Sequence, residues 1–75
     1  MDEPHAGEMI KAELQRQGRT ITWLAKQLGY SRENMYKIFN RKWIYSDLLL
    51  RVSVIMDCDF FRLYSEYYKN KKNVN

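Results

Sequence analysis

The sequence predicts a small all-α domain of five helices. Its 75 residues are enough for one hydrophobic core and too few for two. Hydrophobic residues make up 45% of the chain and aromatic residues 15%, which is typical of a folded globule rather than a disordered chain. Apolar side chains recur with the period of an amphipathic helix, and no segment alternates as a β-strand does. A compact, all-helical domain is therefore expected.

The chain opens with a flexible arm, residues 1–5, which has no helical period and in which His5 is expected to be solvated. A first helix is expected over residues 6–17, because apolar side chains recur there every four residues. Gly18 supplies its end, since glycine readily adopts the left-handed conformation that follows a helix. The apolar positions of this helix are Ala6, Ile10 and Leu14.

Residues 21–40 predict two short helices across one tight turn. Thr20 is placed to cap the first helix, because its hydroxyl can accept a hydrogen bond from a first-turn N–H. Gly29 allows the turn, and Ser31 offers a second cap for a helix over residues 32–40. The apolar faces of these two helices are formed by Leu24, Ala25, Leu28, Met35 and Ile38.

Two further helices complete the predicted domain. Residues 41–45 hold no helical period and are expected to form a connection. A fourth helix is expected over residues 47–57 with Ser46 as its cap, and a fifth begins at Phe60 with Asp59 as its cap. The core positions expected from the first, fourth and fifth helices are Ile10, Leu14, Leu49, Val52, Met56 and Phe60.

Positive charge is concentrated in one part of this chain. The helical domain spans residues 6–69, and residues 70–75 form a polar, basic tail that is expected to fray. The net charge is −3 over residues 1–10, +6 over residues 11–42 and +1 over residues 43–75. Such localised charge suits a polyanion such as DNA, and a solvated basic face is the alternative.

Several classes of protein are not expected. No apolar run approaches the roughly 18 residues of a membrane span, and Asp2 and Glu3 stand where a secretory signal is basic, so a cytoplasmic protein is predicted. One cysteine and one histidine cannot build an internal disulfide or a protein-only zinc site, and Cys58 is expected to be a buried small hydrophobe. With no glycine-rich phosphate loop and no triad pattern, neither an enzyme nor a cofactor, metal or small-molecule ligand is expected.

The spacing within residues 21–40 carries a family resemblance. A small residue lies where the two helices cross, a glycine lies in the turn, and two apolar residues pin the second helix. The fifth, ninth, fifteenth and eighteenth positions of this motif are Ala25, Gly29, Met35 and Ile38. The pattern resembles the helix-turn-helix of the Cro and phage-repressor class, the XRE family. The resemblance covers residues 7–64 and implies a compact five-helix, repressor-like domain that binds double-stranded DNA as a small transcriptional regulator.

By this resemblance the third helix is the recognition helix and enters the major groove. Arg32 can bind O6 and N7 of a guanine, which is worth about 1–3 kcal/mol of discrimination. Glu33 can accept from cytosine N4 or position Arg32, and Tyr36 can contact a thymine methyl or a phosphate. Lys37 is expected on a phosphate, because its side chain is flexible and carries a point charge. The expected base contacts are Ser31, Arg32, Glu33 and Tyr36.

Phosphate contacts are expected on both sides of the recognition helix. Relatives often place an asparagine on a phosphate at the position of Asn40. Many also carry a polar residue, frequently glutamine, at the position of Ile21, which cannot make that contact. For every one of these residues the alternative is a solvated helix surface. For Lys26 and Lys42 this alternative and a phosphate contact are equally well supported. The expected phosphate contacts are Thr20, Thr22, Lys26, Lys37, Asn40, Arg41 and Lys42.

Two tryptophans near the motif need an explanation. Packing is expected for both, Trp23 against the first helix and Trp43 under the connection, with a subunit contact as the alternative. Proteins of this class often bind as symmetric dimers. Candidate residues for a homodimer interface are Tyr64, Tyr67 and Tyr68. The rival function is a helical protein–protein interaction module whose basic face only keeps it soluble.

Overall fold

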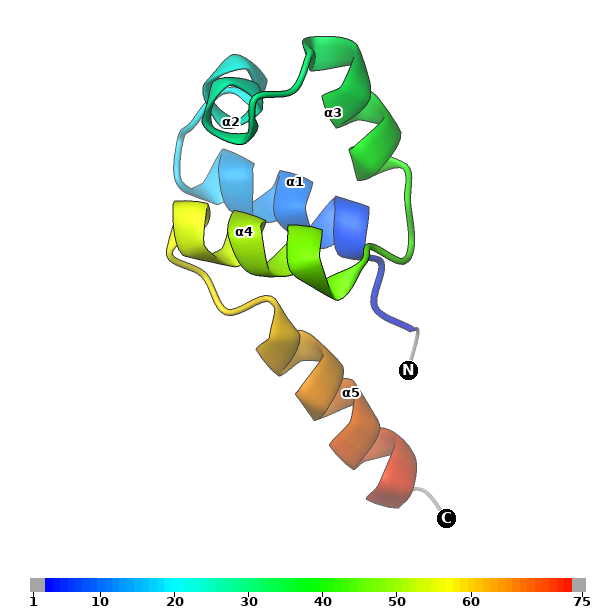
Figure 1. The fold of residues 1–75 in the computed structure, drawn as a ribbon. Helices are drawn as coiled ribbons and strands as arrows, with labels where there is room; N and C mark the ends of the chain where they lie inside the picture. Colours follow the sequence, from blue (N-terminus) through cyan, green and yellow to red (C-terminus); the bar gives the residue numbers. More distant parts are fainter. Residues whose placement is uncertain (1–2, 74–75) are drawn as a thin grey trace.

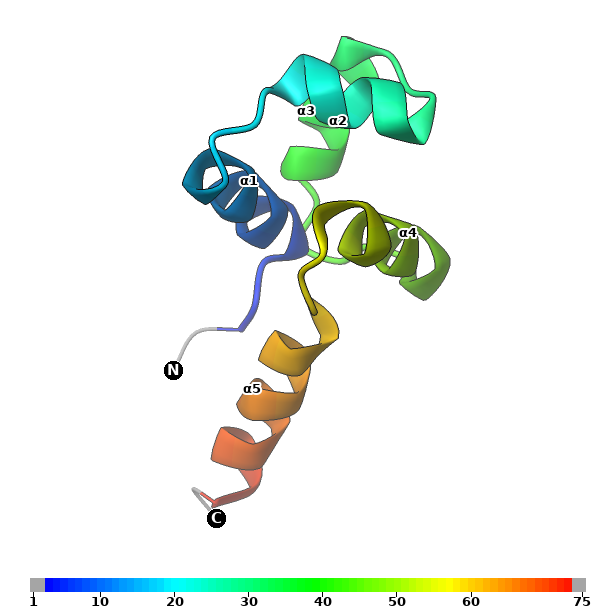
Figure 2. The ribbon, with the colours of Figure 1, turned by 90° about the vertical axis from the view of Figure 1, so that its left-hand side faces the viewer.

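The computed structural model describes residues 3–73, whose regular elements are five helices, so the expected all-α class is confirmed (Figure 1). Four helices pack into one body and the fifth leads away from it, which gives extents of 43 × 21 × 21 Å (Figures 1 and 2). Over the described range, every helix is too short or too polar to cross a membrane. The helices are α1 (Ala6–Arg16), α2 (Ile21–Leu28), α3 (Arg32–Phe39), α4 (Ser46–Met56) and α5 (Phe61–Asn73).

The predicted caps of α2 and α3 are confirmed. The Thr20 hydroxyl accepts a hydrogen bond from the Trp23 N–H at 3.0 Å, and the Ser31 hydroxyl accepts one from the Asn34 N–H at 3.1 Å. Gly29 has a φ of 73° and ends α2 in the left-handed conformation. The turn between the two helices therefore follows the geometry that its residues predict.

Other helix ends differ from the prediction. His5 is not simply solvated, because its Nδ1 accepts from the Glu8 N–H at 3.1 Å and caps α1. Ser46 is the first residue of α4 rather than its cap, and the residue before it makes no side-chain cap. Asp59 does cap α5, through hydrogen bonds from two first-turn N–H groups, but that helix begins one residue later than expected.

The predicted boundaries of the chain ends are only partly comparable with the structure. α5 continues through residues 70–73, four residues beyond the predicted end of the helical domain at residue 69. The helical pattern of the sequence weakens in this basic segment, and the sequence offers no clear stop signal. Residues 1–2 of the expected arm and residues 74–75 of the expected tail lie outside the described residues.

The helices α1, α2, α3 and α4 share one hydrophobic core, and Phe60, the residue before α5, completes it. Every core position that the sequence predicted is buried, and Phe39 joins them from the end of α3. Each large aliphatic or aromatic side chain that is fully buried contributes about 1.5–3 kcal/mol, so these residues hold the helix angles. The buried cluster consists of Ile10, Leu14, Leu24, Ala25, Leu28, Met35, Ile38, Phe39, Leu49, Val52, Met56 and Phe60.

The start of α1 lies against the end of α3. The Ala6 N–H donates to the Lys42 carbonyl at 2.8 Å, and the Gly7 N–H donates to the Arg41 carbonyl at 2.9 Å. A Cβ added at Gly7 would lie 2.2 Å from the Phe39 carbonyl oxygen, well inside contact distance. Only glycine allows this approach, and the two hydrogen bonds hold the residues that follow α3 against the start of α1.

Polar side chains fix α4 against α1 and α2. Arg51 donates through Nη2 to the Leu28 carbonyl at 3.2 Å, which satisfies a group at the end of α2. Gln17 donates through Nε2 to the Met56 carbonyl at 2.8 Å and to Glu13 at 2.7 Å. The bond from Arg51 therefore holds α2 against α4, and the bond from Gln17 to Met56 holds the end of α1 against the end of α4.

Candidate nucleic-acid interface

The outward face of α3 is polar and basic. Its inward side chains are buried in the core, and its N-terminal end lies far from α1 and α5 (Figures 1 and 2). A helix held in this way can present its first two turns to a partner without moving. The residues expected to contact DNA bases, and Lys37 beside them, are exposed: Ser31, Arg32, Glu33, Tyr36 and Lys37.

Arg32 and Tyr36 form a contact pair on this face. Arg32 donates through Nη2 to the Tyr36 hydroxyl at 3.3 Å, and its guanidinium carbon lies 5.9 Å from the ring centroid. The Tyr36 ring in turn meets the buried Phe39 ring edge to face, with centroids 6.4 Å apart. A chain of contacts thus runs from the core to the guanidinium, which restricts the rotamers of Arg32.

The sequence left two roles open for Glu33, a contact with cytosine N4 or the positioning of Arg32, and the structure bears on the second. Arg32 takes Tyr36 as its partner in the described structure, and not Glu33. The Glu33 carboxylate lies in the first turn of α3, where the helix dipole favours a negative charge. The Ser31 hydroxyl oxygen is already used as the cap, so its O–H is the group that remains to donate to a partner.

The N-terminal end of α2 offers the second group of polar side chains. Thr20 and Thr22 are exposed there, and Lys26 is exposed one turn farther along. Arg19, which the sequence reasoning missed, places its guanidinium carbon 4.1 Å from the Trp23 ring centroid. The spacing of four residues between an arginine and a tryptophan is the signal that would have found this pair.

Ile21 serves the core rather than the surface. It is partly buried and packs against the hydrophobic cluster. A polar side chain at this position would lose that apolar contact.

The end of α3 and the following loop offer the third group. Asn40 and Arg41 are exposed, as is Lys42, but Lys42 forms an ion pair with Glu3. The hydrogen bond and the charge of Lys42 lower the pKa of Glu3 below its ordinary value. A phosphate contact by Lys42 would therefore compete with a carboxylate that lies 39 positions away in the sequence.

The two tryptophans have different surroundings. Trp23 is partly buried and packs against the hydrophobic cluster, and its expected contact with the first helix stays a prediction. Trp43 does not lie under the connection, because its side chain is 59% exposed and stacks on Tyr64 of α5 with ring centroids 6.1 Å apart. Lys42 also lies over the Trp43 ring, with its Nζ 5.6 Å from the centroid. The expectation was wrong because Trp43 packs against Tyr64 of α5 instead of being covered by the loop.

Cys58 is partly rather than fully buried, and burial raises the pKa of its thiol. Within residues 3–73, His, Cys, Asp and Glu side chains do not gather in a group that could hold a metal ion. Comparison of the chain with protein-family models, with curated proteins and with solved structures finds no match.

Proposed function

We propose that this protein binds duplex DNA sequence-specifically through α3, as a small transcriptional regulator. The observation that carries the proposal is the Arg32–Tyr36 pair on the exposed face of α3, a helix whose opposite face is buried in the core. Arginine is the usual reader of guanine in the major groove, and a guanidinium with restricted rotamers loses less entropy on binding. The exposed basic and hydroxyl side chains around α3 supply the contacts that a duplex backbone needs.

Salt dependence separates this function from its rival. Fluorescence anisotropy of labelled mixed-sequence duplex should give an affinity that falls steeply with ionic strength, with a slope of about −0.9 per neutralised phosphate. A helical protein-interaction module with a merely solubilising basic face would bind no duplex pool at low salt. That result would reject the proposal.

Substitutions at a proposed base contact and at a proposed phosphate contact should have different effects on sequence preference. Selection from a random duplex library gives the preferred site, and variants are then compared on it and on single-base changes. Arg32→Ala should reduce the free energy of binding to the preferred site by about 1–3 kcal/mol, and it should remove the preference at one base pair. Lys26→Ala should weaken binding to all sequences alike. Lys69→Ala on α5 removes the same charge far from α3 and should leave the preference unchanged. An equal loss from Arg32→Ala at every sequence would remove Arg32 as a base reader.

The Glu3–Lys42 ion pair gives a test of the phosphate surface. Glu3→Gln should remove the carboxylate that competes with DNA phosphates for Lys42, and should steepen the salt slope by up to about 0.9, the value of one further phosphate contact. In a Lys42→Ala background the same change should have little effect on the slope. A steeper slope in that background would mean that Glu3 acts through net charge rather than through Lys42.

A further inference from the structure

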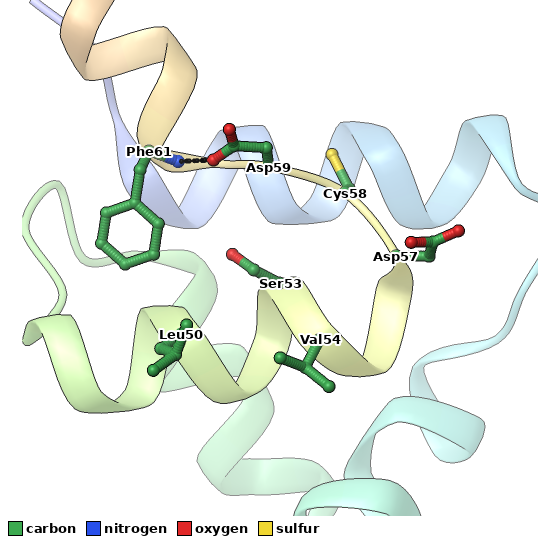
Figure 3. Close-up of a pocket in the computed structure, with 7 residues that line it drawn as sticks. All are labelled: Leu50, Ser53, Val54, Asp57, Cys58, Asp59 and Phe61. Atoms are coloured by element: carbon green, nitrogen blue, oxygen red, sulfur yellow. Dashed lines mark hydrogen bonds between the residues drawn. The ribbon is translucent and has the colours of Figure 1, made fainter.

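An open, partly apolar groove lies between α4 and the start of α5. Its volume is about 470 Å³, and Figure 3 shows its lining side chains around the segment that joins the two helices. Leu50 and Val54 form its apolar wall on α4, and Phe61 points towards α4 from the first turn of α5 (Figure 3). Leu50 is 56% exposed and Val54 72%. Apolar side chains that are exposed together, rather than singly, mark an interaction site.

Acidic residues flank the apolar side chains of α4 on both sides. Leu50 and Val54 lie four residues apart. Asp47 lies three residues before the first of them, and Asp57 lies three residues after the second. These spacings place all four on one side of the helix, opposite the residues of α4 that are buried in the core. Both aspartates are exposed, so an apolar stripe lies between two negative charges that are roughly 15 Å apart along the helix axis.

The charge of this surface is opposite to that of the whole chain. The chain has a net charge of +4, whereas the described residues that line the groove include Asp57 and Asp59 and neither lysine nor arginine. Arg51 is the basic residue of α4, and its guanidinium donates to a carbonyl at the end of α2. Arg62, in the first turn of α5, pairs with Glu66. The groove therefore disfavours nucleic acid and suits a cationic partner.

Asp57 is unfavourable to the fold at the position that it occupies. It ends α4 with a φ of 50°, in the left-handed conformation that favours glycine, and its negative charge lies at the helix C-terminus. Within residues 3–73 its carboxylate forms no ion pair that would offset these effects. A cation that arrives with a partner would supply the missing contact.

We infer that this groove binds an amphipathic helix of a second protein, one whose apolar stripe is flanked by basic residues. The stripe consists of two large apolar residues four positions apart, with a lysine or arginine three positions before the first and three after the second. A helix suits the groove because its side-chain spacings repeat those of α4. The two apolar side chains pack against Leu50, Val54 and Phe61. The two cations meet Asp47 and Asp57.

A synthetic peptide of this chemistry tests the site. The probe is a fluorescein-labelled helix of about 15 residues with the pattern Lys-x-x-Leu-x-x-x-Leu-x-x-Lys, and a lactam bridge on its opposite face holds it helical. The pattern is the same in both chain directions, so either orientation can bind. Fluorescence anisotropy with the full chain should show saturable binding below about 1 mM, and glutamate in place of both lysines should weaken it about tenfold or more. No binding up to about 1 mM, or equal binding of the two peptides, would overturn the inference.

Charge exchange tests whether the peptide occupies this groove. Asp57→Lys should weaken the lysine peptide several-fold and strengthen the glutamate peptide, because it reverses the charge at one end of the stripe. Val54→Lys should weaken the lysine peptide as well, since it places a charge in the apolar wall. Leu63→Lys adds the same charge two residues after Phe61, on another side of α5, and should have little effect. Circular dichroism verifies that each variant is folded. An unchanged preference in Asp57→Lys, or an equal loss from Leu63→Lys and Val54→Lys, would contradict the assignment.

Cys58 lines the groove and is the single cysteine of the chain, so its alkylation reports whether the groove is covered. The rate of alkylation should fall as the lysine peptide saturates the protein, and it should not depend on protein concentration when the peptide is absent. A rate that bound peptide leaves unchanged would place the peptide elsewhere. A rate that falls with protein concentration alone would show that a second copy covers the groove, and would overturn the inference. None of these measurements involves DNA, so their outcome is independent of the proposed function.

Discussion

Gly7 is the position at which one methyl group is expected to do most damage to this fold. In Gly7→Ala the new Cβ would lie 2.2 Å from the Phe39 carbonyl oxygen and 2.5 Å from that of Ile38. Both obstacles are backbone atoms in the last turn of α3, so no side chain can swing aside. The start of α1 has to move away from α3 until the contact is relieved.

The magnitude follows from what that movement breaks. The hydrogen bonds from Ala6 and Gly7 to the carbonyls of Lys42 and Arg41 are 2.8 and 2.9 Å long, and losing both costs about 2 kcal/mol. Overpacking of the helix contact costs about 1–3 kcal/mol more. The higher helix propensity of alanine returns up to about 1 kcal/mol. The net loss is therefore about 2–4 kcal/mol.

Thermal unfolding followed by circular dichroism measures this loss, and 1 kcal/mol corresponds to about 4–8 °C in a domain of this size. Gly18→Ala is the matched control, because a Cβ there meets nothing within 4 Å and only the φ of 70° opposes it. Its expected cost is about 1 kcal/mol. If Gly7→Ala proves no more destabilising than Gly18→Ala, the close approach of α1 and α3 is not what that position provides.

Two further predictions concern α4 and α1. Asp57 ends α4 with a φ of 50° and a negative charge at the helix C-terminus, so Asp57→Gly should stabilise the fold by about 0.5–1 kcal/mol in thermal unfolding. Asp57→Ala removes the charge but keeps the Cβ; a larger gain from alanine than from glycine would contradict the backbone argument. Hydrogen bonds from Arg16 and then Gln17 lower the pKa of Glu13 to about 2 from 4.5. The stability that it contributes is therefore present above about pH 4.5 and is lost as the pH falls towards about 2. Urea unfolding over this range should show a shallower loss for Glu13→Gln, and parallel curves would refute the role of Glu13.

The fold was largely predictable because its main signals are local. The caps at Thr20 and Ser31 and the left-handed Gly29 follow from short-range chemistry that a sequence displays directly. The core positions follow from helical periodicity, which decides which side of each helix is apolar. Neither signal indicates how far α5 extends from the body, since its contacts with other helices depend on the angle at which it leaves Phe60.

The exposure of the candidate site and its contacts within α3 were predictable, but the contacts between distant parts of the chain were not. Periodicity places Arg32 and Tyr36 outward, and their separation by four residues makes the pair itself foreseeable. The Glu3–Lys42 ion pair and the Arg51 bond to the Leu28 carbonyl join distant parts of the chain. Such pairs depend on tertiary arrangement, so a single sequence carries no signal for them. The close approach of α1 to α3 at the first helix start is hidden from the sequence for the same reason.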